Sequence, residues 1–269
     1  MSCAEFCQGP RQRCALRADI ALTNFYIARL LRLPCRFYDL KYCILQVAQI
    51  FEDVKVEELI DVINEDRAVA GFPEIIDISA VEEEVEKRKH YYKDVIKSAL
   101  YNLSPEDIVD MLTEVVKESG EADDTVFPYV LSEIIEIYRI KAQPFFEKET
   151  ENVRKLVQVI KEGLEANRPD SAVREKVDQL VQVMRNWNKV AKPMILRAKI
   201  MGTDYDEAWD FMILFRDLAL FFNNEYGKID FALRLTRSLM GEFSDLEKIS
   251  KTLANDAKML LQLKEERIR

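Results

Sequence analysis

The chain has 269 residues, of which 48% are hydrophobic and 32% charged, with a net charge of −9 at pH 7. This length can bury one large core or two smaller ones, and 7 glycines and 8 prolines are few for a strand-rich fold, which needs many turns. The acidic balance disfavours nucleic-acid binding, because neutralising phosphates needs a basic surface, and no apolar run reaches the roughly 18 residues of a membrane span.

Residues 1–50 differ from the rest of the chain in charge and in cysteine content. They hold seven basic and three acidic residues, a net charge of +4 that leaves −13 for the remainder. All 5 cysteines lie here, and their spacing matches neither a zinc site nor an iron–sulfur motif. An odd number of cysteines without a secretory signal indicates reduced thiols and a cytoplasmic protein.

We predict that this N-terminal segment is partly disordered. Residues 1–18 are polar and basic and form the disordered lead-in. An apolar helix is expected over residues 19–33, ended by Pro34, and a second apolar segment of ambiguous type covers residues 42–51.

Helical spacing of apolar residues begins at Val54 and indicates a first helical subdomain over residues 51–120. Gly71-Phe72-Pro73 ends its first helix, and Ser79 precedes a second, long and charged one. Ser104-Pro105-Glu106-Asp107 is the clearest helix start, with a serine cap, proline in the first helical position and an acid in the capping-box position. An acidic loop follows and marks the subdomain boundary.

A second helical subdomain is expected over residues 121–269. A helix over residues 127–148 should break or kink at Pro144, and helices over residues 152–164 and 171–189 form an αα-hairpin. Pro193 should kink its helix or mark a boundary. Further helices are expected over residues 205–226, 229–240 and 244–269.

The predicted fold class is therefore all-α. About ten helices in antiparallel hairpins would form either an irregular bundle or a solenoid like that of tetratricopeptide repeats.

No pattern of residues typical of a reaction centre is present. His90 is the only histidine and lies among basic residues on a charged helix, which do not orient it as a general base. The glycines are isolated and form no phosphate-binding loop, and one histidine cannot supply a di-iron bundle. We predict no catalytic residue, no metal site and no cofactor.

Aromatic residues gather around the turn at Gly202-Thr203-Asp204, which Trp187 and Trp209 flank. A cluster of this kind could bind a ligand. Its helical spacing favours instead a core between helices, in which aromatic side chains contribute much of the packing energy.

The segment from Ala208 to Leu239 resembles a tetratricopeptide-type helical pair, in which Ala and Leu of the first helix pack on Ala232 and Leu235 of the second. With Val190-Ala191-Lys192-Pro193, roughly the last 85 residues resemble the C-terminal helical region of bacterial proteins that join a J-domain-like segment to such repeats. The resemblance implies binding of peptides or partner helices. The chain lacks a His-Pro-Asp tripeptide, so stimulation of a chaperone ATPase is not implied, and residues 54–189 show no regular 34-residue repeat.

We therefore expect a cytoplasmic protein-interaction or scaffold module that binds a protein or peptide in a groove between hairpins. Association with a chaperone is one option for such a module. No binding to nucleic acid or membrane is expected. The residues expected to contact the partner are Arg185, Trp187, Tyr205, Trp209 and Arg216.

Two alternatives stay open at this point. The first is a small-molecule-binding or enzymatic helical domain with an aromatic pocket around Trp209, also lined by Tyr205 and Phe215. The second is a homo-oligomer that associates through the helix over residues 79–101 or through the final helix.

Overall fold

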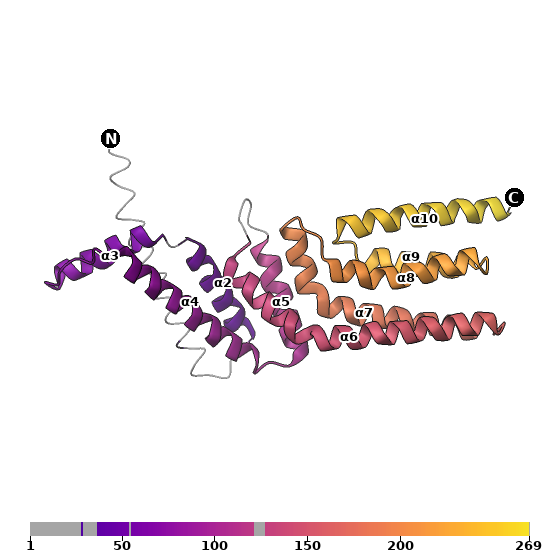
Figure 1. Ribbon diagram of the computed structural model, residues 1–269, viewed down its shortest axis with the longest axis horizontal. Coiled ribbons are helices and arrows are strands. Elements are labelled where there is room, and N and C mark those ends of the chain that lie inside the picture. Colours follow the sequence, from indigo (N-terminus) through magenta and orange to yellow (C-terminus); the bar gives the residue numbers. More distant parts are fainter. Residues whose placement is uncertain (1–27, 29–36, 54, 121–126, 269) are drawn as a thin grey trace. The chain divides into compact units, whose positions relative to one another are not determined.

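The computed structural model describes residues 28, 37–53, 55–120 and 127–268, and within these ranges the chain forms nine helices and no strand (Figure 1). The prediction of an all-α fold is confirmed. The predicted lead-in, four of the cysteines and, apart from residue 28, the predicted helix over residues 19–33 lie outside the described part. The helices are α2 (Phe37–Asp53), α3 (Val56–Val69), α4 (Ile78–Leu100), α5 (Pro105–Ser119), α6 (Tyr129–Glu165), α7 (Asp170–Ile200), α8 (Asp206–Asn224), α9 (Ile229–Glu242) and α10 (Glu247–Ile268).

The chain divides into two compact units, Met1–Glu136 and Ile137–Arg269. The division lies within α6. The sequence placed a subdomain boundary after residue 120 instead, next to residues 121–126, which are outside the described part. Among the described helices none combines the length and the apolar character that crossing a membrane requires.

In the first unit, α2 packs against α4 and α5 and supplies a buried face. The segment that the sequence left ambiguous is therefore helical, and its inward side chains recur at intervals of three or four residues. At the edge of this face Lys41 forms ion pairs with two glutamates of α5, and its hydrogen bonds to Glu118 and Glu114 raise the pKa of Lys41. On this face Leu40, Cys43, Ile44 and Val47 are fully buried.

Two helix starts in this unit show how local side chains set helix ends. Ser104 caps α5 as predicted: its Oγ accepts from the Asp107 backbone N–H at 3.1 Å and donates to the Asp107 carboxylate at 2.7 Å. The sequence placed the start of α4 after Ser79, which is too late, because α4 begins at Ile78 after Asp77, whose carboxylate accepts from the backbone N–H of Ser79 at 3.0 Å. Aspartate caps as well as serine, and its negative charge also suits the helix dipole.

Neither proline ends its helix, so the break predicted at Pro144 and the boundary predicted at Pro193 are wrong, whereas the alternative, a kink at each proline, stays a prediction. One helix, α6, continues through Pro144, and α7 continues through Pro193, so segments expected as separate helices are joined. A proline inside a helix removes one backbone hydrogen bond to the residue four positions earlier. At Pro144 that residue is Ile140, which is 61% exposed, so water can reach the released carbonyl. At Pro193 the Tyr138 hydroxyl donates to the neighbouring Val190 carbonyl at 2.7 Å.

In the second unit, α9 packs against α7, α8 and α10. The pair α8–α9, which the sequence predicted, turns at Gly227 with φ +61°, a left-handed conformation that favours glycine. Phe222 of α8 stacks on Phe231 of α9 with ring centroids 5.2 Å apart. Ala232 and Leu235 of α9 are fully buried. Aromatic residues of α7 and α8 meet in the same core.

Candidate functional site

Trp187 is the centre of an aromatic cluster inside the second unit. It is 1% exposed, and its ring stacks on Phe211 with centroids 4.4 Å apart and an angle of 9° between the planes. The rings of Phe146, Phe243 and Tyr205 surround the stack at centroid distances of 5.1, 6.1 and 6.4 Å from Trp187. A ring enclosed in this way contributes to the core and is not accessible to a partner.

The turn between α7 and α8 determines which aromatic residues reach the surface. Gly202 adopts φ +62°, and the Thr203 N–H donates back to the Ala198 carbonyl at 2.9 Å, a common arrangement at a helix C-terminus. Tyr205 then caps α8 without a side-chain hydrogen bond to the helix. Its hydroxyl points to the Met194 sulfur at 3.9 Å, so Tyr205 is held against α7 and only partly exposed.

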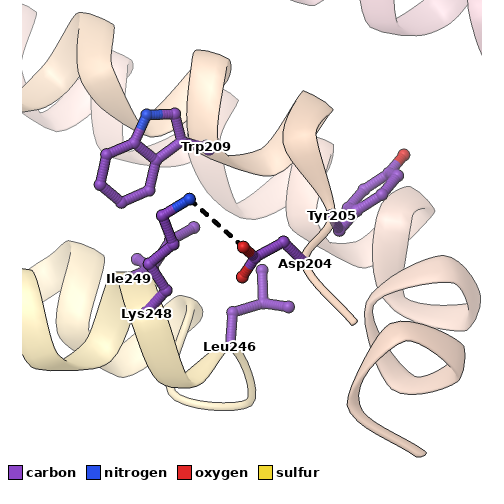
Figure 2. Close-up of a pocket in the computed structure, with 6 residues that line it drawn as sticks. All are labelled: Asp204, Tyr205, Trp209, Leu246, Lys248 and Ile249. Carbon is purple, nitrogen blue, oxygen red and sulfur yellow. Dashed lines mark hydrogen bonds and ion pairs between the residues drawn. The ribbon is translucent and has the colours of Figure 1, made fainter. Parts of the chain in front are cut away.

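Beside this turn lies a shallow pocket that is open to solvent. Its floor is apolar, because Leu246 and Ile249 are 5% and 2% exposed, and Trp209 forms one wall. Figure 2 shows the Lys248 side chain between the Trp209 ring and the Asp204 carboxylate. Its Nζ lies 4.9 Å from the ring centroid and 3.2 Å from the carboxylate.

The structure separates the five residues that the sequence predicted as partner contacts. Only Tyr205 and Trp209 line the pocket. Trp187 is buried and cannot contact a partner, which corrects that prediction. Arg185 has an exposed side chain that pairs with Glu242 at 3.4 Å, outside the pocket. Phe215, which the alternative hypothesis placed in an aromatic pocket, is 0% exposed and belongs to the core.

Arg216 serves an internal contact between α8 and α10. Its Nε and its NH2 group donate to the two carboxylate oxygens of Asp256 at 2.6 and 3.1 Å. The hydrogen bond to Asp256 raises the pKa of Arg216, and Asp256 is only 12% exposed. This two-point pair holds the Arg216 guanidinium against Asp256 inside the fold, so the structure does not support Arg216 as a partner contact.

A second polar cluster, which sequence reasoning missed, joins α7 to the turn between α9 and α10. Asp245 accepts from Lys192 at 2.6 Å and from Lys199 at 2.7 Å, and Asn188 donates to Glu242 at 3.0 Å. Burial raises the pKa of Asp245, but the hydrogen bonds from the two lysines outweigh it and hold the pKa below its usual value. The basic residues recur along one face of α7, but their partners lie far away in the sequence, so only the fold pairs them.

The described residues contain no group of three or more His, Cys, Asp or Glu side chains placed to hold a metal ion. His90 is exposed on α4, with its Nδ1 2.8 Å from the Glu86 carbonyl oxygen of its own helix. The pocket beside Trp209 combines aromatic, apolar and charged side chains on one surface of the second unit.

Comparison with known proteins does not add a family. No protein-family model, curated protein or solved structure matches this chain.

Proposed function

We propose that this chain is a protein-interaction module and that the pocket beside Trp209 receives one side chain of a protein or peptide partner. The observation that carries the proposal is the position of Trp209: its indole stands at the surface, half-buried, with a single lysine over one face. Tryptophan is enriched among the residues that dominate binding energy at protein interfaces.

The composition of the pocket supports a protein partner. Leu246 and Ile249 supply a dry floor, whereas the side chains of Lys248 and Asp204 are 54% and 58% exposed at the rim. An apolar centre with a polar rim is the arrangement of protein interfaces. The rim pair is exposed and contributes little to stability, so Lys248 can move aside at small cost.

The shape of the pocket argues against the alternative function, a binding site for a whole small molecule. The pocket is shallow and open to solvent, whereas pockets that enclose drug-sized ligands have volumes of roughly 300–1,000 Å³. A single apolar or aromatic side chain of a partner can lie across such an open pocket without being enclosed by it.

The finer parts of the sequence interpretation belong to the same proposal. The α8–α9 hairpin, with Ala232 and Leu235 buried between its helices, supports a tetratricopeptide-like pair as the scaffold of the binding surface. The cysteine content supports a cytoplasmic location.

The test selects peptides from a random phage-displayed library on the immobilised full-length chain and measures their affinity by fluorescence anisotropy. For peptides bound at this pocket, Trp209→Ala should weaken affinity by about 2 kcal/mol, or thirtyfold. Met259→Ala is the matched control, because Met259 is 54% exposed on α10 and outside the pocket. Peptides that bind Trp209→Ala as tightly as the unchanged chain would remove the pocket from the proposal.

A thermal-shift screen with metabolites tests the alternative function directly. Stabilisation by a small molecule that disappears in Trp209→Ala would favour a small-molecule site. Light scattering over a range of concentrations tests the homo-oligomer, which would show a mass that rises with concentration.

A further inference from the structure

The turn between α3 and α4, in the first unit, exposes a cluster of large apolar side chains. Val69 ends α3 at 91% exposed, Phe72 and Ile76 in the turn are 61% and 88% exposed, and Ile78 begins α4 at 48% exposed. Figure 1 shows this turn at the end of the α3–α4 hairpin that lies away from α2 and α5. Four such residues within ten positions form an apolar patch (Val69, Phe72, Ile76 and Ile78, hereafter the tip), a feature typical of interaction sites.

The tip is held in one conformation by its own hydrogen bonds. Gly71 adopts φ +76°, and the Phe72 N–H donates to the Arg67 carbonyl at 2.8 Å. The Asn64 amide donates to the Ile75 carbonyl at 3.0 Å and accepts from the Ile75 N–H at 2.7 Å. The Arg67 Nε donates to the Pro73 carbonyl at 2.6 Å.

These bonds satisfy the backbone of the turn without burying its apolar side chains. The exposure of the tip is therefore built into the hairpin. A partner would meet a surface that is already ordered, which lowers the entropy cost of binding.

The charge around the tip indicates the chemistry of its partner. Residues 56–81, which make up α3, the turn and the first residues of α4, contain seven acidic residues and one basic residue, a net charge of −6. All seven acidic residues are exposed. The one basic residue, Arg67, is engaged within the turn, where its guanidinium also lies 5.7 Å from the centre of the Phe72 ring.

We propose that the tip binds a basic, amphipathic segment of a partner protein, whose apolar side chains cover Phe72 and Ile76 while its Lys or Arg side chains face the acids of α3. Both halves of this complementarity are needed, because apolar contact supplies affinity and opposite charge supplies orientation and speed of association. An anionic membrane surface or a nucleic acid would be repelled by the same acids. The tip lies in the first compact unit and the Trp209 pocket in the second. The chain would therefore carry two separate binding surfaces, as a scaffold requires.

The experiment uses the full-length chain and a fluorescein-labelled peptide of about 15 residues, made of Leu and Lys at helical spacing. A matched peptide with Glu in place of Lys is the charge control. The double variant Phe72→Ser, Ile76→Ser removes apolar surface and leaves the charge unchanged. Ile140→Ser is the matched variant elsewhere, because Ile140 is also exposed but lies in the second unit.

We expect the basic peptide to bind the unchanged chain and Ile140→Ser equally, and the double variant at least about tenfold more weakly, because the buried apolar area is lost. Asp61→Asn with Glu74→Gln should also weaken binding and reduce its dependence on salt. The Glu-containing peptide should not bind. Thermal unfolding curves of all variants should coincide with that of the unchanged chain, since the substituted side chains are exposed.

Equal affinity of the basic peptide for the unchanged chain and the double variant would overturn the proposal, as would equal binding of the two peptides. Two other results would assign the tip to a different partner and also overturn it. One is a dimer in analytical ultracentrifugation that the double variant abolishes. The other is co-flotation with phosphatidylcholine–phosphatidylserine vesicles that depends on Phe72 and Ile76. None of these results changes the peptide affinities of Trp209→Ala, so failure here and failure of the proposed function are distinguishable.

Discussion

Replacing Trp187 by alanine tests whether the aromatic cluster is a structural core or a ligand site. The side chain is 1% exposed and is stacked on Phe211, with Phe146 and Phe243 against its other sides. The substitution removes the whole indole from a closed site on α7. The surrounding rings belong to three other segments and can only partly move into the space.

The expected loss of stability is about 4 kcal/mol. Truncating a buried tryptophan or phenylalanine to alanine costs roughly 3–5 kcal/mol, and the stacked pair places Trp187 in the upper part of that range. The control Trp187→Phe keeps a ring in the stack and should cost about 2 kcal/mol, because less volume is lost. Against a total of about 5–15 kcal/mol for a domain, the alanine variant would be close to unfolding.

Urea unfolding followed by tryptophan fluorescence measures this loss. Both tryptophans lie in the second unit, so the remaining Trp209 reports the unfolding of that unit alone. The free energy in water follows from linear extrapolation of the transition. A loss below about 1 kcal/mol would refute the assignment of Trp187 to a closed core.

Three further predictions concern the second unit. Asp245→Asn should lower the free energy of unfolding by about 1–3 kcal/mol, because it leaves two lysines without their carboxylate. Since folding lowers the pKa of Asp245, this stabilisation should be present above the unfolded pKa and lost as pH falls through the folded pKa. Unfolding curves measured from pH 7 to acid should therefore show a smaller loss of stability with falling pH for the variant than for the unchanged chain. Pro144→Ala should stabilise the chain by about 1–3 kcal/mol by restoring the hydrogen bond to the Ile140 carbonyl, and an unchanged or lower midpoint of thermal unfolding would contradict this. In iodide quenching, Trp187→Phe should leave a readily quenched Trp209, whereas Trp209→Phe should leave a protected Trp187; equal quenching of the two variants would show that the assigned exposures are wrong.

The sequence predicted the helices well where the signal is local. The three- and four-residue spacing of apolar side chains placed the first part of α7 and the helices α8, α9 and α10, and the Ser104 cap placed the start of α5. It did not show that the helices continue through Pro144 and Pro193, because a proline weakens a helix by an amount that packing on neighbouring helices can exceed. The residues just after the two prolines make tertiary contacts that no local pattern reports: Phe146 packs on Trp187, and Met194 and Ile195 are buried.

The candidate sites show the same limit. The sequence indicated that Trp187 and Trp209 lie near one turn, but their burial depends on the helices that pack against them: Phe243 helps to close over Trp187, while Trp209, with Lys248 over its ring, stays partly exposed. The acidic charge of α3 is visible in the sequence, whereas the exposure of Phe72 and Ile76 is not, because an apolar residue in a turn is as readily buried as exposed. Composition and periodicity by themselves determined an acidic, all-helical chain. Which side chains of that chain meet the solvent was decided only by the tertiary structure, because burial depends on neighbours that are distant in the sequence.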